Sequence, residues 1–110
     1  MPDSTVDTLN VLRDLVYKDA EAHGLWNREN ARMHELNRQD KTLQRTLAAS
    51  RIHDEVIEAV NAASDPMNYS DELADVIITT LSSAGWLGVD IGTAVSQKIL
   101  FNRCRSYEHK

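Results

Sequence analysis

Apolar residues recur every three or four positions along most of this chain, the spacing that places them on one side of an α-helix. In the first part of the sequence this side consists of Val6, Leu9, Leu12, Val16 and Ala20. Gly24 follows and is a residue type that commonly ends helices. We therefore predict a first helix over residues 5–23. No segment alternates apolar and polar residues as a half-buried strand does, so the predicted fold class is all-α.

Two more amphipathic helices are predicted, over residues 41–63 and 91–107. The apolar side of the first consists of Ile52, Val56, Ala59 and Ala63. Pro66 follows it and cannot continue a helix. Asp90 stands directly before the second helix and is a favourable N-cap residue.

A further helix is predicted over residues 70–87, with Ser70 as its N-cap and Gly85 and Gly88 at its end. Its apolar residues lie on most sides rather than on one: Leu73, Ala74, Val76, Ile77, Ile78 and Leu81. This distribution predicts the central and most buried helix of the protein. Trp86 lies in the same apolar run, and we expect it in the core or at a subunit interface.

The stretch between the first two predicted helices, residues 25–42, is polar and is expected to be only partly helical. Four helices with short connections predict a four-helix-bundle-like fold in a single domain, residues 1–110. A domain of 110 residues covers only part of its apolar surface by itself. We therefore expect a homodimer or a dimer of dimers.

The charge pattern excludes several classes of partner. The net charge is −5 and no basic run occurs, which argues against a nucleic-acid strand as partner. The longest uncharged stretch, from Val76 to Val89, has 14 residues. A membrane-spanning helix needs about 20, so no membrane partner is expected. Cys104 is the only cysteine, and residues 1–4 show no secretory pattern, which favours a cytoplasmic protein.

Two pairs of acidic residues stand out on neighbouring predicted helices. Glu55 and Glu58 are three residues apart, as are Glu72 and Asp75, so each pair lies on one helical face. An unpaired charge on an otherwise apolar helix is costly, and a divalent cation would remove that cost. Oxygen ligands alone favour Mg²⁺, or Mn²⁺ as a substitute, over zinc. The alternative is that these acids are ordinary solvated surface residues.

Lys98, Asn102 and Arg105 are spaced i, i+4 and i+7 and share one face of the last predicted helix. Two cations and an amide beside a carboxylate-bound metal ion would suit a polyphosphate chain. The alternative is a plain wet surface. Trp26 and Tyr107 are candidates for contacting a nucleobase. The alternative for Trp26 is a hydrophobic plug, which is the more common role of a tryptophan after a helix-ending glycine such as Gly24.

The second half of the chain resembles the MazG-like branch of the all-α nucleotide pyrophosphatase superfamily. The signature of that superfamily is E-x-x-E, a spacer, then E-x-x-D. Here the pairs Glu55/Glu58 and Glu72/Asp75 fit the signature with 13 residues between them. The resemblance rests on RIHDEVIEAV at residues 51–60, DELADVI at 71–77, GVDI at 88–91 and KILFNRCRSYEHK at 98–110.

This resemblance implies hydrolysis of a nucleoside or deoxynucleoside triphosphate to its monophosphate and pyrophosphate, as in clearance of unwanted nucleotides. All four acids would hold Mg²⁺, and Glu55 or Glu58 would act as general base. Lys98 and Arg105 would stabilise the leaving pyrophosphate, and Asn102 would position it. Alternative substrates are dUTP, dCTP or phosphoribosyl-ATP, as in other members of the superfamily. The non-enzymatic alternative is a helical dimeric binding module.

Overall fold

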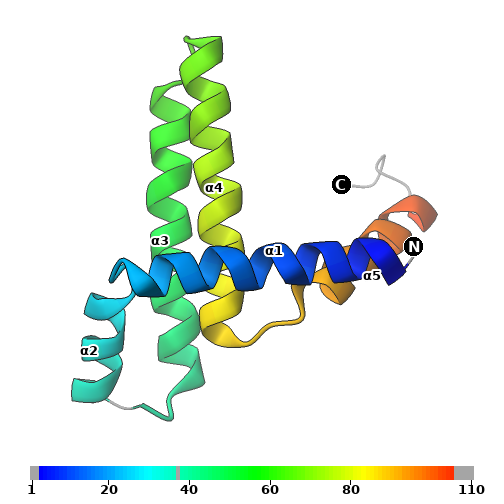
Figure 1. Ribbon diagram of the computed structural model, residues 1–110. Coiled ribbons are helices and arrows are strands. Elements are labelled where there is room, and N and C mark those ends of the chain that lie inside the picture. The colour runs from blue at the N-terminus through cyan, green and yellow to red at the C-terminus, as the bar shows by residue number, and fades with distance from the viewer. Residues whose placement is uncertain (1–2, 37, 106–110) are drawn as a thin grey trace.

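The computed structural model describes residues 3–36 and 38–105, which form five α-helices (Figure 1). In chain order they are α1 (Asp3–Ala22), α2 (Asn27–Leu36), α3 (Lys41–Asn61), α4 (Pro66–Leu87) and α5 (Ile91–Cys104). The described part of the chain contains no β-strand. The prediction of an all-α protein is therefore confirmed.

The helices form an open arrangement and do not close into a four-helix bundle within one chain. Figure 1 shows α3 and α4 as an upright antiparallel hairpin, which α1 crosses near its lower half. Helix α2 packs at the foot of α3, and α5 packs beside α1 after a bend of 119° from α4. The radius of gyration is 15.8 Å. A compact domain of this length would have about 13 Å, so much of the upper hairpin has no neighbour within the chain.

Aspartates cap three of the helices. Asp40, Asp65 and Asp90 each precede a helix and accept a hydrogen bond from the backbone N–H three residues later, which satisfies a donor left open in the first turn. The prediction of Asp90 as a cap is confirmed. The prediction of Ser70 is wrong, because α4 begins with Pro66 directly after Asp65. Proline is well tolerated in the first turn of a helix, where its missing N–H costs nothing.

Gly85 does not end α4 as predicted, and only Gly88 does. Gly88 has a left-handed conformation with φ of 72°, and its backbone N–H donates back into the last turn. Gly85 instead lies inside the helix where α1 crosses it. A Cβ atom at Gly85 would lie 2.4 Å from Cβ of Tyr17, so the absence of a side chain allows this close crossing.

The stretch that was expected to be partly helical forms α2, a ten-residue helix that starts after Trp26. Its buried residues are Glu29 and Met33, and the helix packs against α3. The buried apolar residues of the described chain are Trp26, Met33, Ala48, Ala59, Ala62, Leu81 and Ala84. Most of them lie at the lower half of the hairpin, where α1 and α2 cover it, whereas Ala59 and Ala62 lie at its upper end, where α3 leads into α4.

Helix α4 packs against both α3 and α1, as predicted for the central helix, and it contains more buried residues than any other described helix, but all of them lie in its second half. Leu81 to Ala84 are buried, but Ile77 is 61% exposed. The reason is the open arrangement, since no helix of the same chain covers the upper hairpin. Its exposed apolar side chains are Val56, Ile57, Val60, Met67, Tyr69, Leu73, Ile77 and Ile78.

Within residues 3–36 and 38–105, no single helix is both long enough and apolar enough to span a membrane. By length and composition, α4 and α5 pass that test only when taken together, and a bend of 119° separates them.

Candidate metal centre

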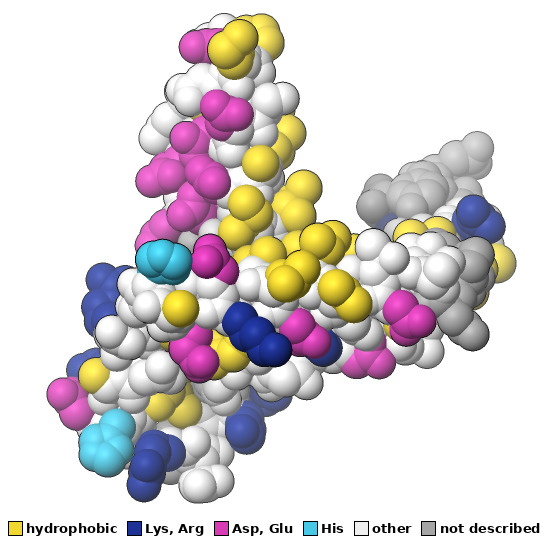
Figure 2. Space-filling view, viewed as in Figure 1, with side chains coloured by type: hydrophobic (Ala, Val, Ile, Leu, Met, Phe, Trp, Pro, Cys, Tyr) yellow, Lys and Arg dark blue, Asp and Glu magenta, His cyan; other side chains and the backbone are white. Residues whose placement is uncertain are grey.

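Three of the four predicted metal ligands meet on one edge of the α3–α4 hairpin. Glu55 and Glu58 lie one turn apart on α3, and Glu72 faces them from the antiparallel α4. One carboxylate oxygen from each of the three lies within 4.8 Å of the other two. Figure 2 shows acidic side chains gathered along this edge of the upright hairpin, while apolar side chains occupy its other edge.

Both the burial and the mutual repulsion of these carboxylates disfavour their charged forms. Burial raises the pKa of Glu55, and the neighbouring carboxylates, Glu58 first, raise it further. The pKa of Glu72 is also raised, first by desolvation and then by the charges of Glu58 and Asp75. The Oε2 atom of Glu72 is covered from solvent, and no donor among the described residues hydrogen-bonds to it. A cation at this position would relieve both the repulsion and the unsatisfied oxygen.

Asp75 stands at the margin of this group. Its side chain is exposed, and its oxygens are not among those within 4.8 Å of one another. Its charge nevertheless raises the pKa of both Glu55 and Glu72, so it lies near enough to interact with them. The hairpin therefore brings together three of the predicted acids closely and the fourth at the edge.

The donor set suits a hard divalent cation such as Mg²⁺. All available donors are carboxylate oxygens, and no histidine or cysteine joins them within the described residues. One oxygen from each of Glu55, Glu58 and Glu72 lies close enough to the other two for the three carboxylates to hold one such ion together. Repulsion between the like charges of the three carboxylates favours the longer separations within this limit of 4.8 Å.

The predicted phosphate-binding stripe on α5 is not brought to the carboxylates within one chain. Lys98 and Arg105 do share a face, since both lie over the ring of Phe101, at 4.8 and 5.7 Å from its centroid. Asn102 is on the same helix, and its side-chain oxygen is covered without a hydrogen-bond donor among the described residues. Helix α5 packs against α1, however, and points away from the acidic edge of the hairpin (Figure 1).

Trp26 is a core residue, which corrects its candidacy for stacking on a nucleobase. It is 1% exposed, its ring stacks on Trp86, and its Nε1 donates to the hydroxyl of Ser82. A ring that is covered in this way offers no face to a ligand. The alternative prediction of a hydrophobic plug after Gly24 agrees with this placement. Tyr107, the other candidate for base contact, lies outside the described residues.

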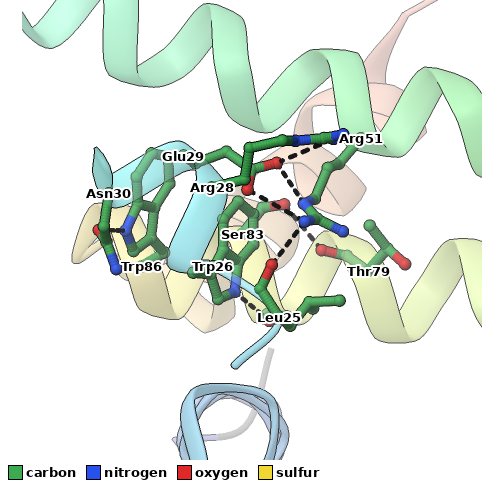
Figure 3. Close-up of polar contacts among 10 residues, drawn as sticks. Leu25, Trp26, Arg28, Glu29, Asn30, Arg51, Thr79, Ser83 and Trp86 are labelled. Atoms are coloured by element: carbon green, nitrogen blue, oxygen red, sulfur yellow. Dashed lines mark hydrogen bonds and ion pairs between the residues drawn. The ribbon is translucent and has the colours of Figure 1, made fainter. Parts of the chain in front are cut away.

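No pattern in the sequence predicted the polar contact that joins α2 to α3. Glu29 is 4% exposed, and both of its carboxylate oxygens accept hydrogen bonds from the guanidinium of Arg51 (Figure 3). The same guanidinium also donates to the backbone oxygen of Leu25. Burial alone would raise the pKa of Glu29, but the bonds from Arg51 and the backbone outweigh it and lower the pKa. Twenty-two positions separate the two residues, so no short-range pattern reveals the pair.

A pocket of about 430 Å³ lies between α2 and α3, beside the Glu29–Arg51 pair. Helix α2 contributes Arg28, Ala31 and Arg32, and α3 contributes Leu47, Ser50 and Asp54. Asp54 directly precedes Glu55, so the pocket and the carboxylate group are neighbours on α3. Its volume is within the range of small-molecule sites.

Comparisons with profiles of known protein families, with curated proteins and with solved structures find no match to this chain. The resemblance to MazG-like pyrophosphatases therefore stays a prediction from the motif residues.

Proposed function

We propose that this protein is a Mg²⁺-dependent nucleoside triphosphate pyrophosphohydrolase, which cleaves a nucleotide to its monophosphate and pyrophosphate. The observation that carries the proposal is the group of Glu55, Glu58 and Glu72 oxygens within 4.8 Å of one another. The raised pKa values of Glu55 and Glu72 add to it, because carboxylates that repel one another in a fold are held there for a reason other than packing. The order E-x-x-E then E-x-x-D is the pattern of the MazG-like family.

Glu55, Glu58 and Glu72 would hold Mg²⁺, or Mn²⁺ in its place, with Asp75 joining from the margin. The ion would supply charge neutralisation for the phosphate oxygens and lower the pKa of water. Glu55 or Glu58 accepts a proton from the attacking water while the oxygen of that water forms a bond to the α-phosphorus. The bond from that phosphorus to the bridging oxygen breaks, and the electron pair leaves with pyrophosphate.

We further propose that the functional unit is a homodimer or a dimer of dimers. The upper hairpin exposes eight large apolar side chains, and α1 adds Val11, Leu12 and Leu15. Figure 2 shows that this apolar surface continues from the hairpin onto α1. A second copy that packs its hairpin against this surface would complete a four-helix bundle and cover it. The α5 stripe, Lys98, Asn102 and Arg105, would then approach the carboxylates from the second copy.

A panel of nucleotides with purified protein, with and without Mg²⁺, tests the activity directly. We expect release of pyrophosphate and a nucleoside monophosphate, only when the metal ion is present. The panel includes dUTP, dCTP and phosphoribosyl-ATP because members of the resembling superfamily differ in substrate. Release of orthophosphate would place the cleaved bond elsewhere and contradict the proposal.

A matched pair of variants tests whether the carboxylate group does the chemistry. Glu72→Gln removes one charge from the group and is expected to reduce turnover at least ~100-fold, because a ligand of the metal ion is lost. Asp71→Asn removes a charge from the adjacent, exposed position and should leave turnover within about twofold of the parent protein. Equal turnover of the Glu72→Gln variant and the parent would exclude the group as the metal centre. Absence of turnover in the parent protein would instead favour the alternative of a helical binding module.

A further inference from the structure

The pocket between α2 and α3 lies in the basic part of an acidic protein. Residues 27–51 contain six lysines and arginines against three acidic residues, whereas the rest of the chain contains six against fourteen. This stretch includes α2 and the first half of α3, which form the pocket walls. Three of the six cations, Arg28, Arg32 and Arg51, line the pocket, together with the acidic residues Glu29, Glu35 and Asp54.

Two arginines on the α2 wall have charge available for a ligand. Arg28 and Arg32 are one helical turn apart, and both line the pocket. The nearest carboxylate of Arg28 is that of Glu29 at 3.8 Å, and Glu29 already accepts both of its hydrogen bonds from Arg51. Arg32 has no ion pair with any described residue. Two guanidiniums so placed can each offer a bidentate donor pair to phosphate oxygens.

The pocket and the carboxylate group lie along one side of α3. Asp54 lines the pocket and lies one turn before Glu58, and Arg51 lies one turn before Glu55. From the level of Ser50 and Arg51 to the level of the two glutamates, the helix rises about 9 Å. A polyphosphate chain bound through a metal ion at the glutamates could therefore extend into the pocket.

We propose that this pocket is the pyrophosphate subsite of the enzyme, with Arg28 and Arg32 holding the β and γ phosphates of the substrate. This inference rests on the proposed function, and it adds phosphate contacts from α2 of the same chain to those proposed for α5 of a second copy. Ser50 adds a hydroxyl donor on the α3 wall, and Ala31 and Leu47 add apolar lining. Glu35 and Asp54 also line the pocket and repel an anion, so binding requires a divalent cation to offset them.

Calorimetric titration of the purified protein with inorganic pyrophosphate, with and without Mg²⁺, tests this assignment. We expect binding only when Mg²⁺ is present. Arg28→Ala and Arg32→Ala should each weaken binding ~10- to 100-fold, the effect of losing a charge-assisted contact to phosphate. Arg28→Lys and Arg32→Lys should recover only part of the affinity, because lysine keeps the charge but loses the paired donors.

Arg45→Ala is the matched control. Arg45 is an exposed arginine on α3 that does not line the pocket, so its removal changes the net charge equally and should alter affinity less than twofold. All three arginines are exposed, and alanine favours helix, so far-UV circular dichroism should be unchanged in each variant.

Three results would overturn the subsite: no binding of pyrophosphate to the parent protein with Mg²⁺, unchanged affinity in the Arg28→Ala/Arg32→Ala variant, or an equal loss in Arg45→Ala. Failure of the proposed function looks different. If no nucleotide is hydrolysed but pyrophosphate binding depends on the two arginines, the pocket is an anion site and the proposed enzymatic activity is wrong. If nucleotides are hydrolysed and pyrophosphate inhibits the Arg28→Ala/Arg32→Ala variant as strongly as the parent, the proposed activity is correct and the proposed subsite is wrong.

Discussion

Trp26 and Trp86 stack with their ring centroids 4.5 Å apart and their planes 11° from parallel. Trp26 comes from the turn before α2, and Trp86 from the last turn of α4 (Figure 3). Each indole also donates one hydrogen bond of 2.8 Å, from Trp26 to the hydroxyl of Ser82 and from Trp86 to the side-chain oxygen of Asn30. The pair therefore holds the turn before α2 against the last turn of α4, at the foot of the hairpin. Helix α2, which follows this turn, forms one wall of the pocket.

We expect Trp26→Ala to be among the most destabilising single substitutions in the chain. It removes a side chain that is 1% exposed, together with its stacking contact and its hydrogen bond. The loss in free energy of unfolding should be about 3–5 kcal/mol. Urea titration followed by far-UV circular dichroism measures it, with Leu36→Ala, at a 54% exposed position of α2, as control. A loss below about 1 kcal/mol would mean that the stack does not anchor α2.

Arg51→Met should destabilise the protein by about 3 kcal/mol, because it leaves the carboxylate of Glu29 buried without its partner. Replacing both residues with methionine should recover much of that loss, since no uncompensated charge remains. Thermal unfolding of the two variants and of Arg45→Met makes the comparison. If the double variant is no more stable than Arg51→Met alone, the cost lies in packing rather than in the unpaired charge.

The metal-free protein should become less stable as the pH rises above the ordinary glutamate value of 4.5. The pKa values of Glu55 and Glu72 are raised in the folded state, so the folded protein binds their protons more tightly than the unfolded chain does. Their contribution is therefore complete below the unfolded pKa and is lost as the pH rises through the folded pKa. Addition of Mg²⁺ at neutral pH should restore the melting temperature.

The comparison that isolates this effect is the melting temperature with a chelator from about pH 4.5 to 7, for the parent and for Glu55→Gln/Glu72→Gln. The double variant should overtake the parent as the pH rises, and it should gain little from Mg²⁺. A constant difference between the two proteins across this range would show that the carboxylates do not repel one another in the fold.

Ile77→Lys should convert the assembled protein to monomers. Ile77 is 61% exposed on the upper hairpin, and a lysine there would place a charge in the proposed interface. Sedimentation equilibrium at micromolar concentration distinguishes the states, with Leu36→Lys on α2 as a control outside that surface. A monomeric parent protein would contradict the proposed assembly.

If α5 of a second copy completes the site, two inactive variants should restore activity when mixed. Lys98→Ala and Arg105→Ala should each reduce turnover ~10- to 1,000-fold through loss of a contact to phosphate. In a mixed dimer of Glu72→Gln and Lys98→Ala, one of the two sites would contain only unaltered residues. Refolding the two together should then recover turnover that neither has alone. No recovery, with mixed dimers demonstrated by tagging, would place α5 outside the site.

The sequence by itself determined the helices, because helix formation depends on spacing and on neighbours within a few residues. The 3.6-residue period marked the long helices, and Asp90 and Gly88 marked ends through their own backbone and side-chain bonds. The spacing of Glu55 to Glu58 and of Glu72 to Asp75 likewise placed each pair on one face. Local patterns could not separate Ser70 from Asp65 as the cap of α4, since both are suitable residue types.

Only the tertiary structure decided which helix faces meet, because that depends on contacts between residues far apart in sequence. It brought Glu72 to Glu55 and Glu58, but it left Lys98 and Arg105 on a helix turned 119° away from α4. The sequence pattern predicts that an apolar residue such as Ile77 is buried, whereas Ile77 is exposed in the fold. The reason is that the spacing of apolar residues does not identify the surface that covers them. The pairing of Glu29 with Arg51 across 22 positions has the same cause: a buried ion pair forms where packing brings two side chains together.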